Sequence, residues 1–211
     1  MQGDFLSLSH QASELLFGYL GERISHLHRS IVLQDDNRPE SLALFIERYV
    51  NMANDVVITL DRLVEELGIS GKLQDQITTA KGFLEVPASI VSRDQGLEAT
   101  MYQAYLAWRL VEELNDVVHV QCGTPLISRD VTTSNLIVHH IIGEPFANQL
   151  DAVIQNHIDR LARSVERDFI IQNKLQTMAN NLDKVLESSY PCLAEVYNIR
   201  LAVHGRGSGS N

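Results

Sequence analysis

The 211-residue chain has few cysteines, few basic residues and no long apolar run. Cys122 and Cys192 form no Cys-x-x-Cys pair, so we expect reduced thiols. Lys and Arg number 17 against 27 Asp and Glu, a net charge of −10 that disfavours binding to nucleic acid or an anionic membrane. The first residues lack the basic start and apolar core of a secretory signal. The sequence therefore predicts a cytoplasmic protein without nucleic-acid or membrane partners.

Several catalytic motifs are also missing. The sequence contains no Gly-x-x-x-x-Gly-Lys phosphate loop, no Gly-x-Gly-x-x-Gly, no Gly-x-Ser-x-Gly and no His-Glu-x-x-His. No segment is predicted as a strand, which disfavours most α/β enzymes. The sequence therefore points away from the common hydrolases, kinases and dinucleotide-binding enzymes.

The clearest pattern that is present is a heptad seam between Pro39 and Gly68. Its apolar residues recur at alternating steps of four and three, which places them on one helical face: Leu42, Ile46, Tyr49, Ala53, Val56, Leu60, Leu63 and Leu67. The run Val56-Val57-Ile58-Thr59 has strand propensity, but the register continues on both sides of it. The seam predicts one long helix with a narrow apolar stripe that packs on another helix.

Other periodic segments predict helices separated by turns. We expect them over residues 7–33, 72–84, 97–120, 130–142, 191–203 and, with a bend near 167–173, from 145 to about 188. The predicted fold is all-α: an antiparallel helical bundle of about six to seven helices with one long C-terminal helix. The helix 97–120 is apolar around most of its circumference, so we place it near the centre. Residues 1–204 are predicted to form one domain, and 205–211 a flexible tail.

A patch of carboxylates and histidines is the first candidate site. Glu112, Asp116 and His119 follow at steps of four and three on one helical face, next to Glu113. Helical bundles hold metals with such side chains, and the next helix could add further ligands: His139, His140 and Glu144. Iron, manganese or zinc would suit this set. Alternatively, these residues form the solvated edge of an otherwise apolar helix.

The segment Glu112-Glu113-Leu114-Asn115-Asp116-Val117-Val118 gives a second interpretation. It resembles one half of the magnesium site in the all-helical nucleotide pyrophosphohydrolases, the MazG-like and dimeric dUTPase group. This resemblance implies acidic residues on two helices that hold Mg²⁺ against nucleotide phosphates. The group also has a Glu-x-x-Glu pair on a preceding helix. This pair is not matched here: Glu66 has Ile69 three residues later in place of a second glutamate, and Glu65 and Glu66 lie far upstream.

A third candidate is Ser25-His26-Leu27-His28-Arg29, which resembles the phosphoacceptor box of histidine kinases. No Gly-rich ATP-binding domain follows, so the resemblance implies a histidine phosphotransfer bundle rather than a kinase. In the alternative interpretation, His26 lies on an ordinary surface with Glu22 and Arg29.

Strong helical packing patterns without a complete active site favour a non-catalytic interaction or regulatory protein. We expect it to act with a protein partner or as a homodimer, since the long last helix extends beyond a single bundle. The competing hypotheses are a metal-dependent helical enzyme and a phosphotransfer bundle. The cofactor stays open: either none or a divalent metal.

Overall fold

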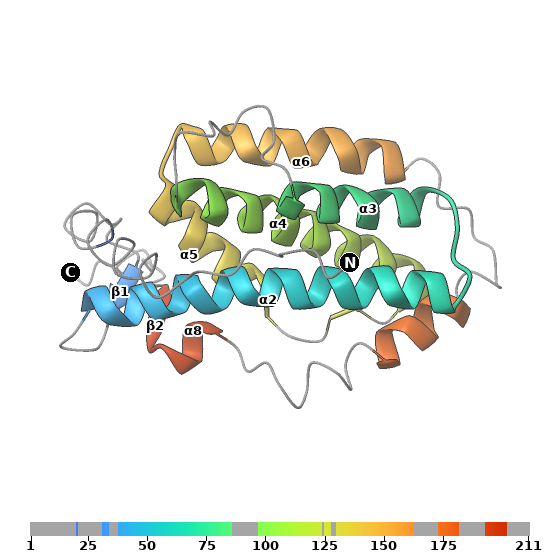
Figure 1. The fold of residues 1–211 in the computed structure, drawn as a ribbon, viewed down its shortest axis with the longest axis horizontal. Helices are drawn as coiled ribbons and strands as arrows, with labels where there is room; N and C mark the ends of the chain where they lie inside the picture. Colours follow the sequence, from blue (N-terminus) through green and yellow to red (C-terminus); the bar gives the residue numbers. More distant parts are fainter. Residues whose placement is uncertain are drawn as a thin grey trace, which may run out of the picture.

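The computed structural model describes residues 20, 31–33, 38–85, 97–123, 125–127, 130–162, 173–181 and 193–201. Its architecture is all-α, as predicted (Figure 1). The helices are α2 (Arg38–Glu66), α3 (Lys72–Glu85), α4 (Leu97–Cys122), α5 (Thr132–Ile142), α6 (Phe146–Ala162) and α8 (Leu193–Val196). Residues 173–181 are also helical. Two short strands, β1 (Ile31–Leu33) and β2 (Ile199–Leu201), complete the described elements.

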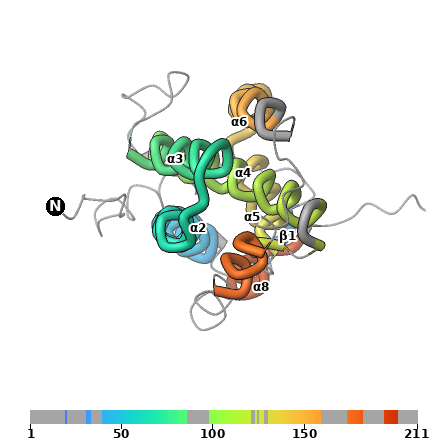
Figure 2. The backbone as a smooth tube through the Cα atoms, turned by 90° about the vertical axis from the view of Figure 1, so that its right-hand side faces the viewer, coloured from blue at the N-terminus to red at the C-terminus, as the bar shows by residue number. Residues whose placement is uncertain are grey.

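Helix α4 lies at the centre of the bundle, as its wide apolar face predicts. It packs against α2, α3, α5 and α6, and Figure 2 shows it running obliquely among these neighbours. Its buried side chains include Leu106, Leu110 and Leu114, none of which is exposed. Because α4 touches all the long helices, a side chain on it can meet groups from distant parts of the sequence.

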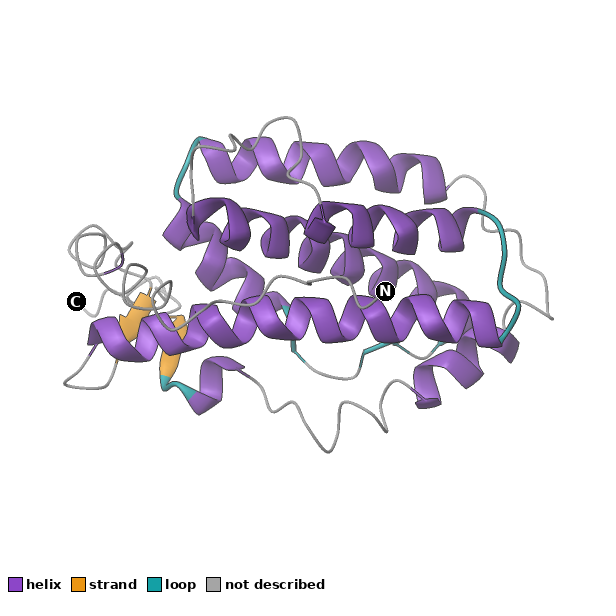
Figure 3. Ribbon diagram, viewed as in Figure 1, coloured by secondary structure: helices purple, strands orange, loops and turns teal. Residues whose placement is uncertain are grey.

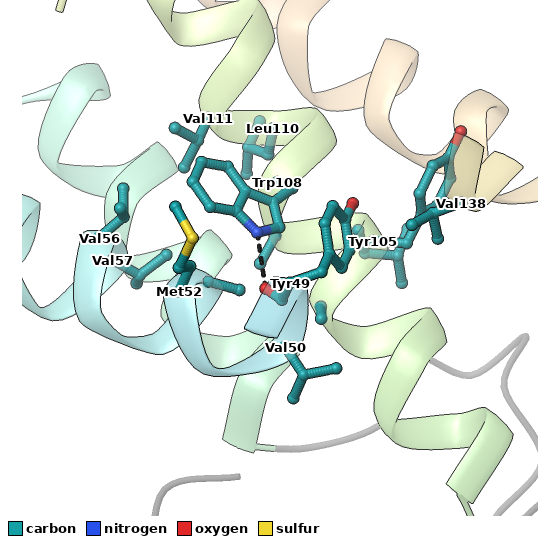
Figure 4. Packing of buried hydrophobic residues seen from close by; sticks show 14 of the residues in the cluster. Tyr49, Val50, Met52, Val56, Val57, Tyr105, Trp108, Leu110, Val111 and Val138 are labelled. Carbon is teal, nitrogen blue, oxygen red and sulfur yellow. Dashed lines mark hydrogen bonds between the residues drawn. The ribbon is translucent and has the colours of Figure 1, made fainter. Parts of the chain in front are cut away.

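The heptad seam of α2 is confirmed, since Leu42 to Leu63 of the seam are all buried and Leu67 is partly buried against the core. The apolar face is wider than the predicted narrow stripe. Phe45, Val50 and Val64, which lie outside the seam, are fully buried as well. Helix α2 therefore packs against neighbours on more than one side. Trp108 of α4 lies against it, and its indole Nε1 donates to the Tyr49 carbonyl at 3.0 Å (Figure 4).

Gly68 ends α2 as predicted, with a left-handed φ of 57°. The Ile69 amide donates to the Val64 carbonyl at 2.9 Å and the Gly68 amide donates to the Glu65 carbonyl at 3.1 Å. This pair of bonds is the Schellman arrangement, in which glycine supplies the left-handed residue without steric cost. The cap turns the chain toward α3.

Replacing glycine by alanine is expected to have opposite effects on stability at Gly68 and at Gly82. Gly68→Ala is expected to lower the free energy of unfolding by about 1 kcal/mol, because a side chain disfavours the left-handed conformation. Gly82 lies inside α3, where an added Cβ would meet nothing within 4 Å. Gly82→Ala is expected to raise stability by about 0.5–1 kcal/mol, since alanine restricts the unfolded chain. Urea denaturation of both variants checks this; a stabilised Gly68→Ala protein would contradict the capping role.

The strands correct two predicted helix boundaries. Residues 31–33, expected at the end of a helix, form β1, and residues 199–201, expected inside the last helix, form β2 (Figure 3). The strands are antiparallel, with Val32 opposite Arg200. Ile31 and Leu33 are buried while Val32 is 40% exposed, which is the alternation of a strand with one buried face. Branched aliphatic residues and cross-strand pairing outweigh the helical period there.

The long helix predicted from 145 to 188 is described in two parts, α6 and the helical segment 173–181. Segment 173–181 lies beside the end of α2, where the Lys174 ammonium donates to the Gly68 carbonyl at 2.8 Å. Figure 1 shows it on the opposite side of the bundle from α6. The predicted bend near 167–173 lies almost entirely outside the described residues, as does the predicted tail 205–211.

Candidate functional site

A polar cluster lies between α4, α5 and α6, inside an otherwise apolar bundle. Helix α4 contributes Tyr105, Arg109 and Glu112, at steps of four and three that place them on one face. Helix α5 contributes Thr132, Asn135 and His139, and α6 contributes Asp151. Helical geometry therefore aligns the residues within each helix, and packing around α4 brings the three sets together.

Arg109 is the centre of the cluster. Its Nε donates to Asp151 Oδ1 at 3.2 Å, its Nη2 donates to Glu113 Oε1 at 3.0 Å, and its Nη1 donates to a Glu112 carboxylate oxygen. Burial lowers the pKa of Arg109, but the carboxylates of Glu112 and Asp151 raise this pKa by more. The guanidinium is therefore charged, and each of its nitrogens is already bound to a carboxylate.

Glu112 is the most enclosed carboxylate of the cluster, with 7% of its surface exposed. One of its oxygens accepts from Thr132 Oγ1 at 2.6 Å, and the other accepts from Asn135 Nδ2 at 2.6 Å and from Arg109. A buried carboxylate is costly unless donors surround it. Here the donors come from both α4 and α5, so Glu112 joins these two helices.

The network continues into the core through Tyr49 of α2. The Tyr49 hydroxyl donates to Asn135 Oδ1 at 2.6 Å. Burial raises the pKa of Tyr49 well above its usual value, and the nearby negative charge of Glu112 acts in the same direction. Tyr49 is therefore a neutral donor, and it fixes the orientation of the Asn135 amide so that the Asn135 nitrogen faces Glu112.

Tyr105, His139 and Asp151 form a second group next to Arg109. The Tyr105 hydroxyl donates to Asp151 Oδ1 at 2.8 Å and lies 2.9 Å from His139 Nδ1, which is 3.2 Å from Asp151 Oδ2. Burial, followed by the hydrogen bond to Asp151, raises the pKa of Tyr105. Because the Tyr105 hydroxyl donates its hydrogen bond to Asp151, we assign a proton to His139 Nδ1, the ring nitrogen that faces Tyr105 and Asp151.

These side chains surround a cavity of about 260 Å³. Polar residues from three helices and one exposed leucine on α5 line it, and the carbon atoms of these side chains contribute apolar surface: Tyr105, Arg109, Glu112, Thr132, Asn135, Leu136, His139, His140 and Asp151. Small-molecule sites are concave and combine such convergent polar groups with apolar surface. The cavity is thus the candidate functional site.

The cluster holds more acid than base. One guanidinium faces the carboxylates of Glu112, Glu113 and Asp151. The pKa of Glu113 is raised by burial and also by the charges of Glu112 and Asp116, although Arg109 lowers it. Burial is the main cause of this rise, and the neighbouring carboxylates act in the same direction.

The structure separates the predicted metal ligands into two groups. Glu112, His139 and His140 line the cavity, and Glu113 binds Arg109 beside it. Asp116, His119 and Glu144 are exposed to solvent. Within the described ranges, no group of three or more His, Cys, Asp or Glu side chains is placed to hold a metal. The seven-residue metal site stays a prediction, and Ser25–Arg29 lies outside the described residues.

Sequence reasoning missed Tyr105, Thr132, Asn135 and Asp151 as site residues. The steps from Tyr105 to Arg109 and from Asn135 to His139 are both four, so each pair shares a helical face that a search for polar periodicity could have found. Asp151 follows Arg109 by 42 residues, and no local pattern connects the two.

No described helix is long and apolar enough to cross a membrane. No protein-family model matches the chain, and no curated protein or solved structure matches it.

Proposed function

We propose that this protein is a non-catalytic regulatory bundle that binds a small molecule in the cavity between α4, α5 and α6. One observation carries the proposal: polar side chains from three helices converge on a cavity of about 260 Å³. A buried polar network costs free energy unless every group is satisfied, so apolar packing would fill this space at lower cost. Its presence favours binding over a purely structural role.

The chemistry of the lining favours binding over catalysis. Nucleophilic catalysis needs a hydroxyl or thiol beside a free base. In the cavity, the hydroxyls of Thr132 and Tyr105 donate to carboxylates, and the oxygens of Glu112 accept from protein donors. These hydroxyls and carboxylate oxygens are already engaged in hydrogen bonds within the protein.

A ligand there would contact side chains of α4, α5 and α6 at once. Binding to the folded state stabilises it by RT ln(1 + [L]/Kd), so occupancy would hold α5 and α6 more firmly on α4. In this proposal, a protein partner or a second copy of the chain responds to the firmer packing of α5 and α6 on α4.

The test compares two leucines with equal exposure. Leu136 lines the cavity and Leu44 lies on α2, and each is 45% exposed. A library of small cations, neutral compounds and anions is screened by ligand-observed NMR and thermal shift. We expect compounds that bind the wild type and Leu44→Trp but lose about tenfold or more in affinity for Leu136→Trp, where the indole occupies the mouth. A ligand at 100 times its Kd should stabilise the fold by about 2.7 kcal/mol.

Two results would redirect the proposal. Conversion of a bound compound into product would show catalysis. A thermal shift with Mg²⁺ or Mn²⁺ plus nucleotides that is lost in Asp116→Ala and His119→Ala would favour the metal-dependent enzyme. If the screen yields no compound whose binding depends on Leu136, the cavity is not the binding site.

A further inference from the structure

The charges that line the cavity indicate which ligands it accepts. Among the lining residues, Arg109 has the permanent positive charge, while Glu112 and Asp151 are carboxylates. Arg109 is already bound to these two and to Glu113, at distances up to 3.2 Å. An anionic ligand would have to compete with three carboxylates of the protein for one guanidinium, so the site disfavours phosphate and carboxylate ligands.

Asp151 is the carboxylate that a ligand can reach. Its side chain is 32% exposed, whereas that of Glu112 is 9% exposed and that of Arg109 is 22% exposed. Its Oδ1 accepts from Tyr105 and Arg109, while Oδ2 lies 3.2 Å from His139 Nδ1. No second donor approaches Oδ2 within the part of the chain that the structure describes. This oxygen therefore retains capacity for a hydrogen bond from a ligand.

The rest of the lining offers the uncharged polar groups of Tyr105, Thr132 and Asn135 beside the place of a hydrogen-bonded cation. Leu136 provides apolar surface at the mouth of the cavity. The cavity has room for a group larger than a water molecule, which needs about 30 Å³. A ligand with N–H donors at one end and an apolar body at the other would match both the Asp151 carboxylate and the apolar surface of Leu136.

We infer that the cavity binds a small organic cation, an amine or amidine whose N–H groups donate to Asp151 and whose body lies against Leu136. This inference rests on the proposed function, because it names the ligand class of the same site. The raised pKa of Glu113, caused first by burial and then by neighbouring carboxylates, agrees with an excess of negative charge that a cation would offset.

Three probes of nearly the same shape separate charge from size: benzamidinium, benzamide and benzoate. Their affinities are measured by ligand-observed NMR and calorimetry on the full-length wild-type protein. We expect benzamidinium to bind about tenfold or more tightly than benzamide, since charge-assisted hydrogen bonds are roughly twice as strong as neutral ones. Benzoate should bind weakest. This ranking needs no variant, so it does not depend on how any substitution folds.

Two substitutions then locate the charge. Asp151→Asn keeps the shape of the anchor and removes its charge, so the preference for benzamidinium over benzamide should fall to about twofold or less. Asp116→Asn removes the same charge from an exposed position on α4, outside the cavity, and should leave the preference unchanged. Circular dichroism of both variants confirms that they are folded.

Each contrary result overturns the inference in a recognisable way. Benzamide or benzoate binding as tightly as benzamidinium, with dependence on Leu136, would keep the binding site and reject the cation. Failure of benzamidinium to bind at millimolar concentration would also reject the cation, while the library screen judges the proposed function separately. Displacement of benzamidinium by Mg²⁺ in the wild type would assign the carboxylates to a metal instead.

Discussion

Glu112→Ala is expected to lower the free energy of unfolding by about 3–5 kcal/mol, the range for breaking a buried charge pair. Its carboxylate accepts from Arg109, Thr132 and Asn135. Removal takes this acceptor from three donors on two helices, and Asn135 among them is only 2% exposed, so water cannot readily replace the lost bond there. The loss should appear in urea denaturation as a lower midpoint with little change in slope.

Glu113→Ala is the matched control, because it removes an adjacent glutamate that binds the same arginine. The Glu113 side chain is 27% exposed, against 9% for Glu112. Partly exposed ion pairs contribute little, so we expect a change of about 1 kcal/mol or less. Equal losses of unfolding free energy in the two variants would mean that the burial of Glu112 does not increase its contribution to stability.

The second large effect is expected in α2. Leu60 is 1% exposed in the seam, and Leu60→Ala should cost about 2–5 kcal/mol, because the substitution removes buried methyl groups and leaves a cavity. Ile58 lies two residues earlier, in the strand-like run, and is 38% exposed. Ile58→Ala should change stability by about 1 kcal/mol or less.

The comparison is made by thermal and urea unfolding of both variants in the same buffer. In a strand, Ile58 and Leu60 would point to the same face and would lose similar stability. A large difference between them is thus specific to the helical register. A loss at Ile58 equal to the loss at Leu60 would contradict that register.

The fold could be predicted where local periodicity and tertiary packing agree. The α2 seam, the Gly68 cap and the central position of α4 follow from spacing alone, because one apolar face per helix must be buried. The strands could not be predicted in this way. Three residues such as Ile31-Val32-Leu33 fit either period, and their partner, Ile199 to Leu201, lies near the other end of the chain.

The site was predictable within single helices, but the contacts between helices were not. The steps of three and four on α4 bring acidic residues to one face, and Glu112 is indeed turned inward. Asp116 and His119 continue the same steps but are exposed. The partners of Glu112 from α5, Thr132 and Asn135, reach it through packing that no local spacing specifies.

The pairing of β1 with β2 has a consequence for how the chain folds. Ile31 meets Leu201 across almost the whole length of the sequence. Closing so long a loop costs entropy that local helix formation does not. The helices between the strands must therefore have compacted the chain before this ladder is favourable. Hydrogen exchange at the Ile31–Leu33 amides would then report completion of the fold, and joining the two ends by circular permutation would test whether the order matters.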